Sequence, residues 1–260
     1  MNSSAASAST SSPAREGRKV ALVTGASRGI GAAIAERLAA DGFAVVVNYA
    51  GRAADAEKVV AAIRGRGGEA VAVQANVAAP AEVAALFDAA ERQFGGIDVV
   101  VSNAGVIQPG LVSLVDTDDA LFDRIIGVNL KGTFNVLRLA AKRVRAGGRI
   151  ITLSSSLVGL SQPGYSIYTG TKAAVEAFTR ILAKELRGRK ITVNCVAPGP
   201  TATDLFLEGK SAEQVANFTK APPLERLGAP VDIAGVVGFL VRADAEWVNG
   251  QTIRANGGVV

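Results

Sequence analysis

The chain of 260 residues is 49% hydrophobic and 20% charged, which is typical of a globular protein with one large core or two small ones. It has no histidine and one cysteine, which excludes a Ser-His-Asp triad, a His-ligated zinc, an intrachain disulfide and a thiolate zinc cluster. No metal site is predicted, and any proton transfer must use Tyr, Lys, Asp or Glu. Cys195 lies in an apolar run, where a buried side chain is expected rather than a nucleophile.

The formal net charge is +5, from 28 basic and 23 acidic residues that are scattered among one another. No long basic run with interleaved aromatic residues is present, so a nucleic-acid partner is not expected. No run of about 18 apolar residues is present either, so no segment is expected to span a membrane. A small molecule is therefore the predicted partner.

Residues 1–17 are rich in Ser and Ala and show no apolar periodicity, which predicts a disordered tail before a single domain at residues 18–260. A Ser-rich, acid-poor transit peptide is the alternative, although the segment has one arginine and no clear amphipathic face. The apolar core of a secretion signal is missing, so the cytoplasm is the predicted compartment.

From Lys19 onward, short β-rich runs that are apolar on both faces alternate with segments that carry one apolar stripe at helical spacing. The predicted strands are residues 20–23, 44–47, 70–73, 99–101, 150–153 and 191–196, with a last strand near residues 251–254. Helical spacing is clear at residues 34–38, 59–63, 83–87, 136–144 and 231–240. Six such βα units predict an α/β fold with helices on both faces of a parallel sheet, and they are too few for an eight-stranded barrel.

The segment Thr24-Gly25-Ala26-Ser27-Arg28-Gly29-Ile30-Gly31 follows the first strand and opens the first helix. Its three glycines allow a sharp turn, a close approach of the backbone to a pyrophosphate and tight packing of helix against strand. The amide groups and the positive dipole end of the helix then point at the anion. The predicted cofactor contacts in this glycine turn are Gly25, Ser27, Arg28, Gly29, Ile30 and Gly31.

The spacing of the glycine turn, Thr-Gly-x-x-x-Gly-x-Gly, resembles the cofactor signature of the classical short-chain dehydrogenase/reductase family. Four further motifs follow in the order of that family: Asn103-Ala104-Gly105, Asn129, the set Ser155, Tyr168 and Lys172, and Pro198-Gly199. The resemblance extends from Lys19 to the last residue, and the chain is most similar to 3-oxoacyl-carrier-protein reductases and related carbonyl reductases. It implies a single-domain, Rossmann-type doubly wound parallel sheet that binds a nicotinamide cofactor.

The second predicted strand ends Val47-Asn48-Tyr49 and has no acid, whereas an acid there would bind an adenosine ribose and repel a 2′-phosphate. Arg28 lies in the glycine turn and Arg52 follows the second strand, and either guanidinium can pair with a 2′-phosphate. We therefore predict NADPH rather than NADH as the cofactor, with Asn48 and Tyr49 among its contacts. Use of NAD is the alternative.

The resemblance implies the remaining cofactor contacts. They are Asn76 and Val77 at the adenine, Asn103, Ala104 and Gly105 at the ribose, and Pro198, Gly199, Thr201 and Thr203 at the nicotinamide carboxamide. Many relatives carry Asp where this chain has Asn76, and an Asn side chain keeps an acceptor and adds a donor. For Asn103 the alternative is support of the sheet alone, and the Pro-Gly loop would also suit any rigid turn.

Tyr168 and Lys172 are four residues apart, which places both side chains on one face of a helix. The family pattern implies that Tyr168 transfers a proton, and a nearby ammonium is expected to lower the phenol pKa from its ordinary value of ~10. The resemblance implies that a serine about thirteen positions before Tyr168 holds the substrate oxygen, which selects Ser155, with Ser156 as the alternative. Asn129 lies in a helical stretch at residues 122–143, and the resemblance implies that it distorts that helix and binds a proton-relaying water. The alternative is that it only caps or kinks the helix.

The loops at residues 106–111, 157–165 and 200–221 follow predicted strands and are mostly apolar or small. Residues 205–218 are predicted to form a mobile lid. We therefore predict NADPH-dependent reduction of a carbonyl, either a ketone or a 3-oxoacyl-type group, to an alcohol. An NAD-dependent secondary alcohol dehydrogenase and a non-catalytic cofactor-binding regulator are the alternatives.

The family resemblance also implies a homotetramer. The helices around residues 129–145 and 168–186 are then expected to lie between subunits. Residues 247–251 and 259–260 are expected either to join a second interface or, for the latter, to pack into the core of their own chain.

Overall fold

The computed structural model describes residues 17–260, so the predicted tail lies outside the described residues except for its last position. Seven parallel strands form one sheet in the order β3-β2-β1-β4-β5-β6-β7. They are β1 (Val20–Val23), β2 (Ala44–Tyr49), β3 (Glu69–Gln74), β4 (Ile97–Ser102), β5 (Val144–Leu153), β6 (Thr192–Pro198) and β7 (Thr252–Ala255). Every predicted strand is present, and the order reverses between β1 and β4, as it does in a doubly wound Rossmann-type fold.

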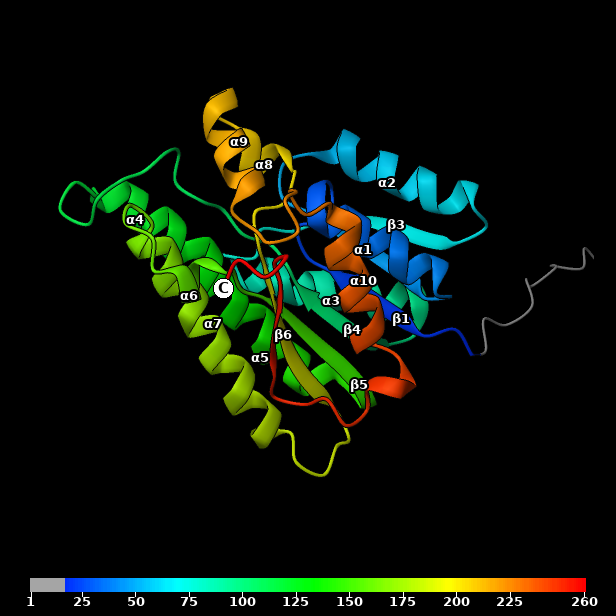
Figure 1. The fold of residues 1–260 in the computed structure, drawn as a ribbon. Coiled ribbons are helices and arrows are strands. Elements are labelled where there is room, and N and C mark those ends of the chain that lie inside the picture. The colour runs from blue at the N-terminus through cyan, green and yellow to red at the C-terminus, as the bar shows by residue number, and fades with distance from the viewer. Residues whose placement is uncertain (1–16) are drawn as a thin grey trace, which may run out of the picture.

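Helices cover both faces of the sheet, and Figure 1 shows α1, α2 and α10 on one side with α5 and α7 on the other. The first face carries α1 (Gly29–Ala40), α2 (Ala53–Gly65) and α10 (Pro230–Leu240), and the second carries α3 (Pro80–Phe94), α5 (Thr133–Arg143) and α7 (Ser166–Glu185). The shorter helices are α4 (Asp119–Ile125), α6 (Leu157–Leu160), α8 (Asp204–Leu207), α9 (Ala212–Lys220) and the 3-10 turn η2 (Ala243–Ala245).

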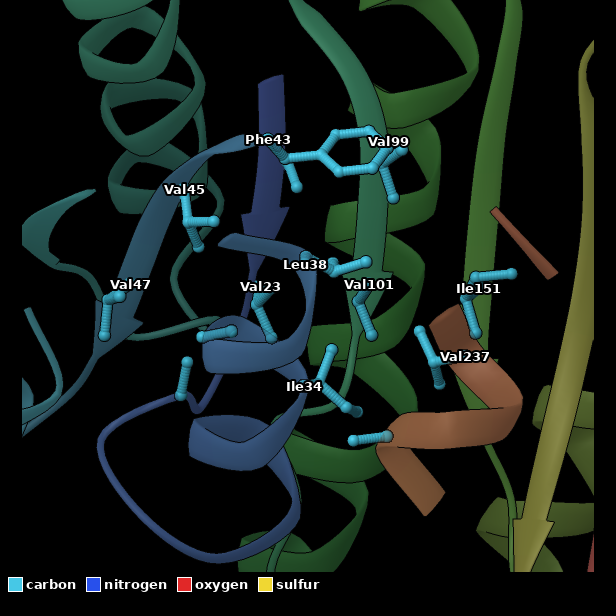
Figure 2. Close-up of a cluster of buried hydrophobic side chains, with 14 of the residues drawn as sticks. Val23, Ile34, Leu38, Phe43, Val45, Val47, Val99, Val101, Ile151 and Val237 are labelled. Carbon is cyan, nitrogen blue, oxygen red and sulfur yellow. The ribbon is translucent and has the colours of Figure 1, made fainter. Parts of the chain in front are cut away.

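A core cluster fills the space between the sheet and α1 (Figure 2). Val23, Val47 and Val101 come from three neighbouring strands and are fully buried, as are Ile34 and Leu38 of α1. Each buried aliphatic side chain of this kind contributes about 1.5–3 kcal/mol to folding. The cluster holds α1 firmly against the strands and thereby fixes the position of its N-terminus at the end of β1.

The stretch predicted as one helix at residues 122–143 consists of three pieces. A seven-residue π-helix, Ile126–Gly132, separates α4 from α5. The wider π-helical turn distorts the helix at Asn129, in agreement with what the family resemblance implies. Gly132 ends this piece beside Val77, because a Cβ at Gly132 would lie 2.7 Å from Cγ2 of Val77.

The predicted lid forms α8 and α9, and the rings of Phe206 and Phe218 join the two helices with their centroids 5.2 Å apart. Its mobility stays a prediction. The last residues return from β7 toward α6, and Figure 1 shows this end of the chain beside α6 and α7. A Cβ at Gly159 would lie 2.7 Å from Cγ2 of Val260, so this end packs on its own chain.

Trp247, the only tryptophan of the sequence, lies between η2 and β7 with 99% of its surface exposed. Among the described residues, no helix combines the length and the apolar character that crossing a bilayer requires.

Candidate active site

A cavity of about 610 Å³ lies at the carboxyl ends of the central strands, beside the point where the strand order reverses. Open α/β sheets bind their ligands at this position. Almost all of the predicted residues line the cavity: Gly25, Ser27, Arg28, Gly29, Ile30, Gly31, Asn48, Asn76, Val77, Asn103, Ala104, Gly105, Ser155, Tyr168, Lys172, Pro198, Gly199, Thr201 and Thr203. The structure therefore brings together motifs that are spread over most of the chain.

Tyr49 and Asn129 are the predicted residues that do not line the cavity. Tyr49 packs against the core cluster of Figure 2, on the same strand face as Val47. Successive side chains of a strand point to opposite faces, so Asn48 reaches the cavity and its neighbour Tyr49 does not. The expectation that Tyr49 contacts the cofactor finds no support in this arrangement.

The glycine turn forms one end of the cavity. Gly25 and Gly29 have φ angles of 62° and 57°, a left-handed conformation that glycine adopts without strain. A Cβ at Gly25 would lie 2.8 Å from Cα of Ala104, and one at Gly31 would lie 2.5 Å from Nδ2 of Asn103. Helix α1 begins at Gly29 without a side-chain cap. A close backbone turn followed by uncapped helical amide groups fits a pyrophosphate.

Two of the predicted cofactor residues hold the glycine turn in place through their side chains. Asn48 accepts a hydrogen bond from the amide of Gly25 at 3.2 Å and donates to the carbonyl oxygen of Ala75 at 3.0 Å. Asn103 donates to the carbonyl oxygens of Thr24 and Gly25 at 2.8 and 3.0 Å. Both side-chain amides are therefore engaged within the protein, and their clearest role is to shape the turn.

Arg28 and Arg52 form a basic rim at the cofactor end of the cavity. The Arg28 guanidinium lies 3.8 Å from the Asp204 carboxylate, and Arg52 lies 3.4 Å from Asp55. Exposed ion pairs of this kind are weak, so both guanidinium groups remain available to a stronger anion. Two guanidinium groups near a strand end without an acid fit a 2′-phosphate.

Tyr168 and Lys172 lie one turn apart on α7 and line the opposite part of the cavity. The Lys172 ammonium lies 5.6 Å from the centre of the Tyr168 ring and donates a hydrogen bond to the carbonyl oxygen of Leu153 at 2.8 Å. Burial lowers the pKa of Lys172 to about 8. Burial also raises the pKa of Tyr168 to about 12, and hydrogen bonding with Ser155 only partly opposes it.

The expected lowering of the phenol pKa is therefore not the net effect in this structure. Loss of water around the phenol disfavours the phenolate more strongly than the neighbouring polar groups favour it. The same loss of water acts on Lys172 in the opposite direction, because burial penalises the charged form of either group. At neutral pH the Tyr168 side chain is thus a protonated phenol that can donate a hydrogen bond, and it lies beside the ammonium group of Lys172.

The three adjacent serines differ in their partners. Ser154 donates to the Glu176 carboxylate at 2.7 Å, and Ser156 is 2% exposed and accepts a hydrogen bond from Asn256 at 3.0 Å. All three serines line the cavity, and Ser155, whose hydroxyl accepts a hydrogen bond from the amide of Leu157 at 3.2 Å, is the one within hydrogen-bonding reach of Tyr168. The arrangement favours Ser155 over Ser156 as the serine that faces a substrate.

Asn129 is fully buried behind the cavity wall. Its side chain accepts a hydrogen bond from the amide of Val106 and donates to the carbonyl oxygen of the same residue, both at 2.8 Å. It also donates to the Thr171 hydroxyl at 3.4 Å, next to Lys172 on α7. Asn129 therefore ties the π-helix to the loop after β4 and to α7, and the water relay stays a prediction.

The loop after β6 is stiffened by its own threonines. The Thr201 hydroxyl donates to the carbonyl oxygen of Gly199 at 2.9 Å, and the Thr203 hydroxyl caps α8 by accepting from the amide of Phe206 at 3.2 Å. Thr203 also packs against Gly29, since a Cβ there would lie 3.3 Å from Cγ2 of Thr203. This contact places the loop beside the glycine turn at the cavity.

The cavity is also lined by residues that were not predicted as part of the site, namely Ala50, Gly51, Ala75, Val128, Leu153 and Val259. Val128 directly precedes Asn129, so the position of that motif was a usable signal. Gly51 lies between the second strand and Arg52, in a turn whose course depends on α2. Val259 follows the last strand by four residues and has no signal in the sequence.

A glycine cradle and a buried tyrosine–lysine pair that share one cavity define a nicotinamide-dependent oxidoreductase with a Rossmann fold. The family model described as enoyl-(acyl carrier protein) reductase matches residues 25–260. The chain is 51% identical over 252 residues to a short-chain type dehydrogenase/reductase of Picea abies, which covers 94% of this chain and 93% of the relative. The chain belongs to the short-chain dehydrogenase/reductase family.

Two further similarities concern proteins whose names mention the cofactor. A chloroplastic NADPH-dependent aldehyde reductase-like protein of Arabidopsis thaliana is 46% identical over 254 residues, with 93% of this chain and 94% of the relative covered. The crystal structure of a short chain dehydrogenase from Burkholderia cenocepacia in complex with NADP has a TM-score of 0.87 and 39% identity, covering 93% of this chain and 97% of that one. These findings confirm the predicted family and fold, and they agree with the predicted NADP cofactor.

Proposed function

We propose that the protein catalyses the NADPH-dependent reduction of a carbonyl, either a ketone or a 3-oxoacyl-type group, to an alcohol. NADPH, when bound, supplies the hydride that adds to the carbonyl carbon. The glycine turn and the N-terminus of α1 would hold its pyrophosphate, Arg28 and Arg52 its 2′-phosphate, and the loop after β6 its carboxamide. The observation that carries the proposal is the convergence of Ser155, Tyr168 and Lys172 on the same cavity.

Each of these three side chains has its own task. The Tyr168 phenol, whose pKa of about 12 keeps it protonated at neutral pH, donates its proton to the carbonyl oxygen as negative charge develops there. The Ser155 hydroxyl donates a hydrogen bond to the same oxygen. The Lys172 ammonium, with a pKa of about 8, stays charged at neutral pH and stabilises the phenolate left after the transfer.

The test is the substitution Tyr168→Phe, which removes the proton donor and leaves the ring. General acid catalysis contributes typically about 10²- to 10⁴-fold, so kcat is expected to fall by that factor. NADPH affinity, measured by fluorescence titration, is expected to stay close to that of the parent protein. The matched control is Tyr49→Phe, on the core side of β2, which should keep full activity. Equal rates for Tyr168→Phe and the parent would contradict the proposal.

Specific observations rank the alternatives lower. The basic rim of Arg28 and Arg52 supports NADPH over NADH, and a direct comparison of the two affinities tests the NAD-dependent alcohol dehydrogenase. The intact set of Ser155, Tyr168 and Lys172 supports turnover over a purely regulatory role. The similarity to an aldehyde reductase-like protein supports a carbonyl as the substrate. The apolar lining residues Leu157, Leu160, Phe206 and Phe218 support a substrate with a hydrophobic body.

The proposal includes a homotetramer and a cytoplasmic location. Phe122 on α4, Phe134 on α5 and Ile181 on α7 are 42%, 47% and 54% exposed, which supports a subunit contact on that face. Light scattering at several protein concentrations tests the assembly. The Arabidopsis relative is named chloroplastic, so microscopy of the full-length protein fused to a fluorescent protein is the test of the compartment.

A further inference from the structure

The five residues that follow β7, Asn256–Val260, touch several walls of the cavity and are called here the 256–260 segment. A Cβ at Gly199, in the loop after β6, would lie 2.7 Å from Cα of Asn256. A Cβ at Gly257 would lie 3.0 Å from Cβ of Pro222, just beyond α9. Val259 itself lines the cavity. A segment far from Ser155 in sequence therefore forms part of the cavity wall.

Asn256 uses every hydrogen-bonding group of its side-chain amide. Its Nδ2 donates to Oγ of Ser156 and to the carbonyl oxygen of Val260, both at 3.0 Å. Its Oδ1 accepts from the amide of Gly258 at 2.9 Å. No aliphatic side chain of the same size can replace these three bonds. The amide thus both folds the 256–260 segment and fastens it to Ser156.

Ser156 passes this restraint to its neighbour Ser155. The amide of Ser156 donates to the carbonyl oxygen of Pro198 at 2.9 Å, and Ser154 on the other side is held by Glu176 at 2.7 Å. The residues on both sides of Ser155 are therefore fixed. Of these three contacts, the bond from Asn256 to Ser156 is the one whose partner lies outside β6 and α7.

We propose that Asn256 is a positioning residue for Ser155, acting through Ser156, and that Val259 is a specificity-determining residue at the substrate end of the cavity. The inference rests on the proposed carbonyl reduction. Reduction requires the Ser155 hydroxyl and the Tyr168 phenol to meet one substrate oxygen, and small displacements of such groups are costly to the rate. Asn256 fixes the serine, and Val259 limits the size of the group that enters beside it.

The first experiment measures carbonyl reduction and NADPH affinity for the parent protein and for Asn256→Leu. The variant keeps the size of the side chain and loses its three hydrogen bonds. We expect kcat to fall by up to about 10²-fold, the loss that misplacement of a reacting group by about 1 Å can cause, with NADPH affinity unchanged in a calorimetric titration. An unchanged kcat overturns the inference. A loss of NADPH affinity as large as the loss of kcat also overturns it, because the substitution would then act on the cofactor-binding loop at Gly199.

A double-variant cycle tests the route through Ser156. Ser156→Ala removes the other end of the same bond, so it should lower kcat by a similar factor, and combining it with Asn256→Leu should add little. If the double variant loses kcat by the product of the two single losses, the two residues act independently, and the inference that Asn256 acts through Ser156 is wrong. If Asn256→Leu does not fold, Ser156→Ala carries the test, and an unchanged kcat for it overturns the inference.

The matched control is Asn249→Leu. Asn249 lies in the turn before β7 and accepts a hydrogen bond from the amide of Val193 at 2.8 Å, so it also joins a turn next to β7 to β6. We expect a lower Tm with kcat unchanged. A parent protein that does not reduce carbonyls contradicts the proposed function, whereas an active parent with an equally active Asn256→Leu variant contradicts only the inference.

Val259→Leu tests the second part. The larger side chain narrows the substrate end, so KM for a bulky aryl ketone should rise about tenfold while KM for a small ketone and NADPH affinity stay constant, the size of effect that a methylene group has in an apolar pocket. Equal changes of KM for both ketones, or no change for either, overturn the role of Val259.

Discussion

The two ends of the cavity are built in different ways. The cofactor end consists of backbone and glycine, and the side chains of Asn48 and Asn103 hold it from behind. The substrate end consists of side chains on short helices and loops, among them Leu160 and Leu205, which are still 39% and 40% exposed. The cofactor, which is the same in every such enzyme, is bound by a fixed backbone. The substrate, which differs between enzymes, is bound by side chains that can be replaced without changing the fold.

The largest effect is expected from breaking the cofactor end at Gly31. In Gly31→Ala the new methyl group would overlap the carbonyl oxygen of Gly25 and lie 2.5 Å from Nδ2 of Asn103. The turn must then open, and binding of NADPH should be lost in a calorimetric titration. The control is Gly235→Ala in α10, where an added Cβ meets nothing within 4 Å. It should bind NADPH normally and be more stable, by up to about 1 kcal/mol.

The next largest effect is expected at the substrate end, where a substitution of Ser155 should lower kcat. Ser155→Ala removes the hydroxyl that faces Tyr168, and loss of one such donor typically lowers kcat about 10²- to 10³-fold. Ser154→Ala, which removes a hydroxyl bonded to Glu176 instead, should lower kcat far less. Steady-state kinetics on both variants checks this, and a reversed order would assign the substrate oxygen to a different serine.

A smaller effect is expected at the basic rim, where the cofactor end uses side chains. Replacing Arg28 or Arg52 by Ala should lower the affinity for NADPH about tenfold each, because a charged hydrogen bond contributes roughly 1.5–3 kcal/mol. The affinity for NADH, which lacks the 2′-phosphate, should not change. The control is Arg66→Ala. Arg66 forms an ion pair with Glu36 at 2.8 Å, and neither residue lines the cavity. A parallel loss for NADH would show that the rim does not read the phosphate.

The smallest effect concerns pH and the buried ammonium of Lys172. Its pKa is lowered from 10.5 to about 8, so between these values the unfolded chain binds more protons than the folded one. Stability therefore rises as the pH goes from about 8 to about 10.5. Lys172→Met removes this dependence, so the Tm difference between parent and variant should shift in favour of the parent over that window. A difference that is flat with pH would contradict the lowered pKa.

Much of the fold and of the cofactor end could be predicted because both depend on local patterns. A run of β-branched and apolar residues predicts each strand. The spacing of Gly25, Gly29 and Gly31 predicts the turn that these glycines form. The side chains behind that turn could not be assigned in the same way. Asn48 and Asn103 look like cofactor ligands in sequence, yet their partners are backbone groups of other segments.

The substrate end was harder to predict because its parts meet only through the tertiary fold. The direction of the Tyr168 pKa depends on how much water the surrounding chain removes, which no spacing of Tyr and Lys contains. The distortion expected at Asn129 takes the form of a seven-residue π-helix, and the bond of Asn129 to the backbone of Val106 depends on the tertiary fold. Val259 enters the cavity only because the turn at Asn256 brings it back.

The exposed indole of Trp247 gives the protein its own optical probe. Because the sequence has no other tryptophan, emission excited at the red edge of indole absorption comes from one known position. Water around the ring places that emission at long wavelength, and a neighbouring subunit over the turn before β7 would move it to shorter wavelength. A dilution series in a fluorimeter can therefore report self-association of the unlabelled protein at this one surface.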